Sequence, residues 1–429
     1  MQAVLTALFA LCLIAPARAG VDIQHWQTTG GTRVYFIASP ALPILDVQVD
    51  FAAGSMFDPP GKAGLAALTR GVLDLGAADL DENAIADRLA DVGATLSGGA
   101  DTDRASLSLR TLVAADKRGP ALELLRKLLA APRFDPAIFE RERARTVAAL
   151  KESLTRPDTL AGQAFWTALY PDHPYGRQAT PASLAALSLA DLRAFHQRHY
   201  HAANARITLV GQISRAQAAE WAETLAAALP PGAPADLPAP PQAGTRTLVS
   251  LKHPATQAHI HIGLPGVERG HPDFFPLLVG NYTLGGGGFV SRLMQEVRDK
   301  RGYAYGVSSR FSFLRQAGPF QISLQTKRSQ AREALKVVRV VLDGFLRDGP
   351  SEDELAAAKA NLSGSFPLRL DSNQKLLENA ALIGFYDLPL DYLDRYPQQV
   401  EAVTAEQVRK AFARHVRPDA LVTVLVAAE

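Results

Sequence analysis

The sequence predicts an α+β protein of two tandem homologous lobes, each an antiparallel sheet with helices on one face. Three observations lead to this prediction. Strand patterns group with strands and helix patterns with helices. A Pro- and Ala-rich segment, Pro230 to Gly244, divides the chain into nearly equal halves. Both halves end in the same helix, turn and strand pattern. A parallel doubly wound sheet is the weaker alternative.

The strand and helix patterns repeat in the two halves. Period-two alternation and β-branched runs predict strands, and apolar residues at helical spacing predict helices. The predicted strands are 33–36, 45–51, 94–97, 105–112, 247–251 and 257–263. The predicted helices are 64–75, 82–92, 122–129, 138–154, one starting at Phe274 and one over 330–348.

The ends of the two halves indicate a tandem duplication. SLADLRAFHQRHYHAANARITLVG begins at Ser188, and TAEQVRKAFARHVRPDALVTVLVA begins at Thr404. Each has a hydroxyl N-cap, a short amphipathic helix, a polar turn and a β-branched strand. His199 aligns with His415 at a constant offset.

The composition is typical of a globular protein, and the charge distribution does not indicate a polyanionic partner. The chain has 429 residues, of which 47% are hydrophobic and 21% charged, enough for two domains. Its 45 basic and 43 acidic residues are dispersed, giving a net charge of +2. Without a basic run, nucleic acid binding is not expected.

The first nineteen residues predict a signal peptide. An apolar stretch from Ala3 to Ile14 precedes the small-residue pattern Ala17-Arg18-Ala19, so cleavage is expected after Ala19 and the mature chain in the periplasm. A membrane anchor is the alternative, but the apolar stretch is short for a span, and no later segment is long and apolar enough. Cys12, the only cysteine, lies in this segment, so the mature chain offers no thiol nucleophile, disulfide or cysteine metal ligand.

The segment FAAGSMFDPPGKAGLAALTRGVLDLGA, from Phe51 to Ala77, carries a family resemblance. It resembles the start of the catalytic domain in the pitrilysin and mitochondrial processing peptidase family of zinc metallopeptidases. There a Gly-Ser strand end and an acidic-proline turn precede a Gly-Leu-Ala helix with the inverted zinc motif H-x-x-E-H. In this sequence Ala67 and Gly71 stand at the two histidine positions, and Arg70 stands at the glutamate position.

These substitutions remove the chemistry of the zinc motif. Zinc catalysis needs two imidazoles on one helix face and a carboxylate base. Ala67 and Gly71 offer no lone pair, and Arg70 brings a positive charge. The distal carboxylate is expected between Val147 and Glu152, and Glu152 stands a few positions off the expected spacing. The resemblance thus implies a chain that holds no metal and is inactive alone.

The second half carries the family's other signature. LGGGGFVSRLMQEVRDKRGYAYGVSS, Leu284 to Ser309, is similar to its glycine-rich loop, Ser-Arg-Leu helix and arginine–tyrosine pair. Arg298 and Tyr305 match that pair, which the resemblance implies orients substrate carbonyls and stabilises the oxyanion. Gly285, Gly286, Gly287 and Gly288 would form a wall of the substrate cleft. HPYGR, from His173 to Arg177, also fits the family.

Ordinary explanations exist for each of these residues. The glycine run could cradle phosphate, but the Lys and Ser or Thr of a P-loop do not follow it, and it could be a loop without a role. Arg298 could belong to a solvated charged face with its neighbours Glu296, Asp299, Lys300 and Arg301. Tyr305 could be a core aromatic.

Two histidine sets raise the possibility of a substitute metal site. His259 and His261 share one face of a predicted strand, and His196, His199 and His201 cluster near a helix end. Neither has a carboxylate at a recognisable ligand spacing, so polar surface and helix-end hydrogen bonding are the expected roles.

The resemblance implies a two-lobed clamshell with a peptide-binding chamber. The expected layout is a signal peptide (1–19), a domain with the degenerate zinc motif (20–229), a linker (230–244) and a domain with the Arg/Tyr pair (245–429). The chain would be the non-catalytic member of a heterodimer whose partner carries H-x-x-E-H and the zinc. Alternatives are a peptide-binding scaffold without a catalytic partner and a self-contained hydrolase with an unrecognised site.

Overall fold

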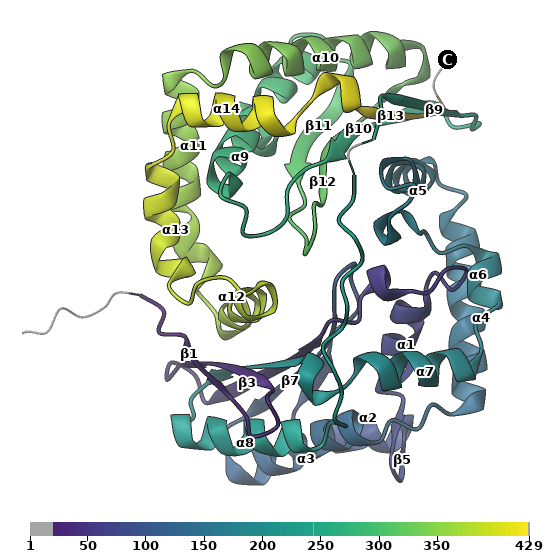
Figure 1. The fold of residues 1–429 in the computed structure, drawn as a ribbon, viewed down its shortest axis with the longest axis vertical. Helices are drawn as coiled ribbons and strands as arrows, with labels where there is room; N and C mark the ends of the chain where they lie inside the picture. The colour runs from purple at the N-terminus through teal and green to yellow at the C-terminus, as the bar shows by residue number, and fades with distance from the viewer. Residues whose placement is uncertain (1–19, 243, 428–429) are drawn as a thin grey trace, which may run out of the picture.

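A computed structural model describes residues 20–242 and 244–427 (Figure 1). The expected signal peptide, 1–19, lies outside the described residues. The chain forms two lobes, each built on one sheet, with the first half below and the second half above in Figure 1. No helix in the described ranges is both long and apolar enough to cross a bilayer.

The sheet of the first lobe has six strands in the order β1-β2-β8-β3-β7-β6. Only the β2–β8 pair is parallel. The bounds are β1 (Gln24–Gln27), β2 (Arg33–Ala38), β3 (Ile44–Phe51), β6 (Thr95–Ser97), β7 (Ala105–Leu112) and β8 (Ala205–Gly211). A separate two-stranded ribbon joins β4 (Gly76–Ala77) to β5 (Leu80–Asp81).

The sheet of the second lobe has five strands in the order β11-β12-β10-β13-β9. Its only parallel pair is β13–β9. The bounds are β9 (Thr247–Leu251), β10 (Gln257–Pro265), β11 (Ala304–Phe311), β12 (Pro319–Lys327) and β13 (Val422–Val426).

The two sheets have the same topology, as the duplication predicts. In chain order β2, β3, β6, β7 and β8 correspond to β9, β10, β11, β12 and β13, and both sheets place them in the spatial order first, last, second, fourth, third. Each last strand follows a helix with a capping box, at Ser188 in the first lobe and Thr404 in the second. The sheets are not wholly antiparallel as predicted, because each last strand pairs in parallel with the first.

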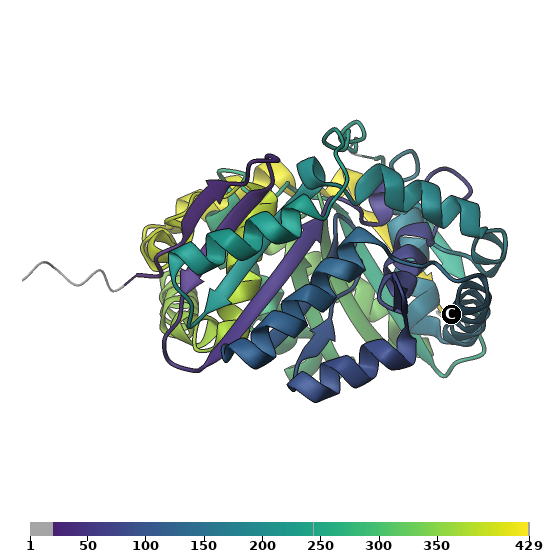
Figure 2. The same ribbon diagram turned by 90° about the horizontal axis from the view of Figure 1, so that it is seen from below.

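Helices cover the outer face of each sheet; those of the first lobe lie in front in Figure 2, and those of the second lobe lie at the top of Figure 1. In the first lobe α2 (Glu82–Val92), α3 (Ala115–Ala130) and α8 (Arg215–Ala227) form this layer. The second lobe has α9 (Phe274–Asn281), α10 (Ala331–Asp348) and α14 (Ala405–His415). Apart from two helices that lie between the lobes, the other α-helices are α1 (Leu65–Leu73), α4 (Pro136–Ser153), α6 (Pro181–Ala185), α7 (Leu189–His199), α11 (Glu352–Gly364) and α13 (Tyr392–Glu401).

The inner faces are covered by helices exchanged between the lobes. The second half supplies α12 (Asn373–Tyr386), which packs on the first sheet, and the first half supplies α5 (Pro157–Leu169), which packs on the second (Figure 1). Phe165 of α5 is fully buried in a core made mainly by the second lobe. The prediction of helices on one face is therefore incomplete, and the lobes are joined by shared core as well as by the linker.

A buried carboxylate also connects the lobes. Asp103, in the connection between β6 and β7, accepts hydrogen bonds of 2.8 Å each from the hydroxyls of Tyr175 and Tyr386 and from the backbone N–H of Arg315. Tyr175 belongs to the HPYGR segment, while Arg315 and Tyr386 come from the second half. Burial raises the pKa of the Asp103 carboxyl. The three donors explain how this polar group is accommodated.

The predicted linker has no helix or strand in its described residues, 230–242 and 244, and it runs from α8 toward β9 between the lobes (Figure 1). Ala202 donates its backbone N–H to the Pro230 carbonyl at 3.0 Å. The Gln316 side chain donates to the Pro238 carbonyl. The linker is thus held by both lobes along its path.

Candidate functional site

The degenerate motif lies on α1, whose first turn is fixed by a buried aspartate. Gly64 precedes the helix with φ +99°, a conformation that favours glycine. The Asp58 carboxylate accepts 2.7 Å hydrogen bonds from the N–H groups of Gly64 and Ala66. Burial raises the pKa of Asp58 to about 6. Arg177 of HPYGR donates to the Asp58 carbonyl at 2.9 Å, so both resembling segments build this helix start.

The three motif positions point in two directions. Ala67 and Gly71 are exposed, whereas Arg70 is only 4% exposed. The Arg70 guanidinium donates to the carbonyls of Ser97 and Ser106, which belong to the edge of the first sheet, and lies 3.2 Å from the Asp74 carboxylate. Arg70 therefore acts as a structural tie between α1 and the β6–β7 hairpin.

The helix expected to supply the distal carboxylate is α4. Glu152 is exposed near its end. The buried carboxylate of α4 is Glu142, which sequence reasoning did not single out, and it pairs with Arg141 at 3.0 Å and Arg145 at 2.7 Å. Only the tertiary packing of α4 distinguishes it from the other acidic residues of that helix.

The glycine-rich segment in the second half is helical rather than a hairpin-like loop. The chain continues from α9 into a π-helical turn over Tyr282–Gly286, then a 3-10 turn over Gly288–Val290 and a second π-helical segment over Met294–Asp299. A Cβ on Gly285 would lie 2.6 Å from the backbone nitrogen of Ser309 in β11. Gly285 thus permits close helix–strand approach, while Gly286 and Gly288 are exposed. π-helical segments are rare and frequent at functional sites.

Arg298 and Tyr305, the pair that the resemblance singled out, lie close together. The Arg298 guanidinium carbon lies 5.1 Å from the centre of the Tyr305 ring and 4.6 Å from that of Phe289. Tyr305 is 89% exposed and Phe289 is 65% exposed. Sequence reasoning missed Phe289, although it directly follows the glycine run. Cation–π attraction orders the arginine between two rings that face solvent.

The charged neighbours of Arg298 form pairs without it. Glu296 binds both Lys300 and Arg301 at 2.6 Å. Within the described residues, no carboxylate lies within ion-pair distance of Arg298. The solvated charged face considered from the sequence therefore consists of Glu296, Lys300 and Arg301, and the Arg298 guanidinium stays available to a ligand.

The histidine sets are arranged as structural residues. His261 lies against Phe165 of α5, and His199 lies between Phe57 and Phe195. Burial lowers the pKa of His196, His199 and His261 to about 4. Neither set forms a group of three possible metal ligands within residues 20–242 and 244–427.

A different group does bring three possible ligands together. Ligand atoms of His271, Asp273 and His415 all lie within 4.8 Å of one another. His415 lies 2.7 Å and Arg414 lies 2.6 Å from the same Asp273 oxygen, and His271 Nδ1 accepts the Asp273 N–H at 3.0 Å. Among the described residues the Asp273 carboxylate is therefore already engaged by His415 and Arg414, whereas His271 Nε2 makes no hydrogen bond. Sequence reasoning missed this cluster because residues 273 and 415 lie far apart along the chain.

Family models match both halves of the chain. The model described as insulinase (peptidase family M16) matches residues 33–181, and the one described as peptidase M16 inactive domain matches residues 186–362. A crystal structure of a peptidase M16 inactive domain from Pseudomonas fluorescens is 37% identical, with a TM-score of 0.91 over 95% of this chain and 98% of that one. The chain belongs to peptidase family M16, and its second half matches the domain that this family's model describes as inactive.

Two further proteins are informative. The non-peptidase homolog YmxG of Helicobacter pylori is 25% identical over 90% of this chain and 89% of its own length. The crystal structure of the periplasmic protease PqqL from Escherichia coli shares the fold, with 18% identity and a TM-score of 0.80. This chain covers 49% of the PqqL chain.

Proposed function

We propose that this chain is the non-catalytic subunit of a periplasmic zinc peptidase heterodimer. In this assembly it binds peptide and contributes Arg298 and Tyr305 to an active site whose zinc is held by a partner bearing H-x-x-E-H. Arg298 would orient backbone carbonyls of the peptide, and the Tyr305 hydroxyl would donate to the developing oxyanion.

One observation carries the proposal. Arg298 lies between two solvent-facing rings, and Tyr305 is 89% exposed beside it. The Arg298 side chain makes no hydrogen bond or ion pair to a described residue, so its donors remain free beside an exposed tyrosine. The pair is suited to a surface that another molecule completes.

Two further observations support the role of a subunit. Ala67, Arg70 and Gly71 cannot bind zinc or activate water, and Arg70 is committed to the edge of the first sheet. PqqL is described as a protease, and this chain aligns with 49% of the PqqL chain, or about half of it. A partner of similar size would supply an equivalent second half. The small-residue pattern ending at Ala19 supports export.

The test is reconstitution. The mature chain, residues 20–429, is mixed with an exported chain of similar size that carries H-x-x-E-H, and cleavage of a quenched unstructured peptide is followed. We expect neither chain alone to cleave it and the mixture to cleave it as a complex on size-exclusion chromatography. Zinc-dependent cleavage by the isolated chain would refute the proposal. Peptide binding by a chain that forms no complex would favour the scaffold alternative.

A further inference from the structure

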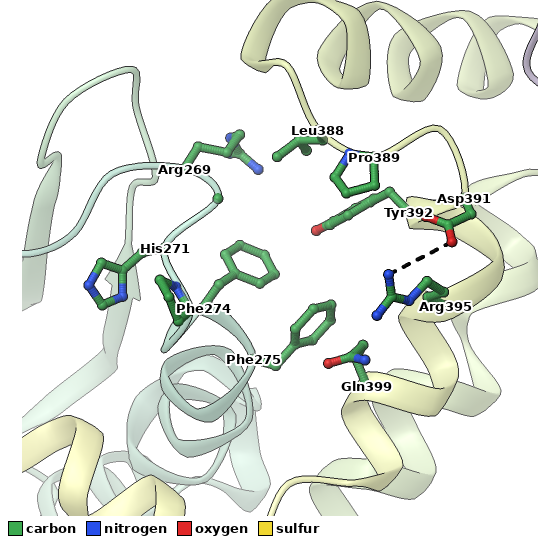
Figure 3. Close-up of a pocket in the computed structure, with 12 residues that line it drawn as sticks. Arg269, His271, Phe274, Phe275, Leu388, Pro389, Asp391, Tyr392, Arg395 and Gln399 are labelled. Carbon is green, nitrogen blue, oxygen red and sulfur yellow. Dashed lines mark ion pairs between the residues drawn. The ribbon is translucent and has the colours of Figure 1, made fainter.

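The strongest unassigned feature is a pocket of about 210 Å³ at the surface of the second lobe (Figure 3). It lies between the loop that leads into α9 and the connection from α12 into α13. Phe274, Phe275, Leu388 and Tyr392 supply apolar walls. The rings of Phe275 and Tyr392 are 6.2 Å apart, and those of Phe274 and Phe275 are 5.0 Å apart. The walls could hold an apolar group of aromatic size.

Arg269 lines this pocket and lacks a charged partner. Its Nε donates to the Phe313 carbonyl at 3.1 Å, and its guanidinium carbon lies 5.0 Å from the Tyr386 ring centre. Among the described residues, no carboxylate is within ion-pair distance of Arg269, and its Nη atoms donate to no acceptor. Burial lowers the pKa of the guanidinium. The Asp103 carboxylate attracts this cation from beyond ion-pair distance and already accepts three hydrogen bonds, so the Arg269 Nη atoms remain available to an anion.

A second donor points into the same space. The Tyr392 hydroxyl is directed into the pocket in Figure 3, and it makes no hydrogen bond to any described residue. Burial raises its pKa to about 12, so the hydroxyl stays protonated and can donate at neutral pH. Asp391 is the acidic residue of the lining, and its carboxylate is 3.8 Å from Arg395 at the rim. Arg269 and Tyr392 thus give this pocket two donor groups that no described acceptor engages.

We propose that this pocket binds a carboxylate attached to an apolar group. The carboxylate pairs with the Arg269 guanidinium and accepts from the Tyr392 hydroxyl, and the apolar group packs between Phe274, Phe275 and Leu388. Planar guanidinium and carboxylate groups match in a bidentate arrangement. The C-terminal residue of a peptide and a free small carboxylic acid both have this chemistry. The site does not depend on the role proposed for Arg298 and Tyr305.

The test compares acids with their neutral amides, using calorimetry on the mature chain. The probes are N-acetylphenylalanine, its amide, phenylacetate, and one unstructured pentapeptide ending in phenylalanine with a free or amidated terminus. We expect saturable binding of the acids and at least about tenfold weaker binding of the amides, because each amide lacks the charge that pairs with Arg269. A peptide acid that binds about tenfold tighter than the small acids identifies a peptide terminus as the source; equal affinities identify a small acid.

Two variants assign the contacts. Arg269→Gln should weaken acid binding about tenfold or more and leave amide binding unchanged, and Tyr392→Phe, which keeps the ring, should weaken acid binding several-fold. Arg347→Gln, at an exposed arginine outside the pocket, is the matched control. Equal binding of acids and amides, no saturable binding of any acid, or wild-type acid affinity in the Tyr392→Phe variant would overturn the proposal. Because Tyr392→Phe removes a single hydroxyl that bonds to no described residue and keeps the ring, this test remains decisive if Arg269→Gln fails to fold.

Discussion

The Arg298 guanidinium lies 5.1 Å from the centre of the Tyr305 ring, and the arginine is half-buried beside this exposed tyrosine of the same lobe. The two residues are seven positions apart, on a π-helical segment and the following edge strand. The turn at Gly302, with φ +62°, reverses the chain between them. This arrangement gives the proposed function its sharpest tests.

Tyr305→Phe and Arg298→Ala should have different kinetic effects in the reconstituted heterodimer. Tyr305→Phe removes only the donor to the oxyanion, so turnover should fall by about one to three orders of magnitude while peptide binding persists. Arg298→Ala should also weaken peptide binding, since it removes several donors. Steady-state kinetics on a quenched peptide measure both effects. Arg301→Ala, which breaks a pair with Glu296, is the control. Wild-type rates for both variants in an intact complex would refute the shared site.

The isolated mature chain should contain no stoichiometric zinc, because the α1 positions carry no ligand atoms. Metal analysis after purification without chelators measures this. His415→Gln is the control, since it removes one member of the His271, Asp273 and His415 group. One tightly held zinc per chain that the His415→Gln variant loses would place a metal at that group and contradict the expectation.

Arg70 should matter for stability. Arg70→Glu would place a carboxylate against the Ser97 and Ser106 carbonyls and beside Asp74, so we expect the free energy of unfolding to fall by about 3–5 kcal/mol. Arg70→Met should cost about 1–3 kcal/mol, because it leaves acceptors without a donor. Denaturant unfolding gives both values, and Arg126→Met, at a more exposed helix pair, should change stability by under about 1 kcal/mol. Similar losses in all three variants would show that Arg70 is not a structural tie.

His199 should destabilise the fold in mild acid. Its pKa is lowered to about 4 by burial first and then by Arg198, so the unfolded chain takes up a proton below about pH 6.5 while the folded chain stays neutral. Stability is therefore lost as pH falls from about 6.5 to 4, by up to about 3 kcal/mol.

His199→Phe should remove this contribution and keep the ring packing against Phe57 and Phe195. The difference in unfolding free energy between variant and wild type should shift in favour of the variant between pH 7.5 and 4.5. Asp50 and Asp58, whose pKa values burial raises to about 6, act in the opposite direction in both proteins and cancel in this comparison. A difference that is constant with pH would contradict the assignment.

Cutting the linker should leave the lobes associated. A site-specific protease sequence inserted between residues 230 and 244 would produce two fragments that still exchange α5 and α12 and share the Asp103 hydrogen bonds. We expect the fragments to elute together on size-exclusion chromatography and to unfold in one transition. Separation without denaturant would show that the linker is what holds the lobes together.

Much of the local structure could be predicted from the sequence. The strands at 105–112 and 247–251 and the helix at 82–92 have the predicted bounds. Each of these segments has a clear period of its own or a strong cap, such as Asp81 before α2. The glycine-rich segment was misjudged as a loop, because its helical form depends on β11 packing against Gly285. A prediction from the helix propensities of single residues does not take the packing of β11 into account.

The sequence by itself was enough to recognise the duplication, the family and the loss of the zinc ligands, because all three depend only on residue identity and spacing. Tertiary structure alone decided that α5 and α12 change lobes, that Arg70 binds the sheet edge, and that Arg269 lies unpaired beside Tyr392 in a pocket. Those facts depend on contacts between segments more than a hundred residues apart or on which side chains become buried. Long-range contacts and burial leave no local pattern in the sequence, because both are properties of the packed fold.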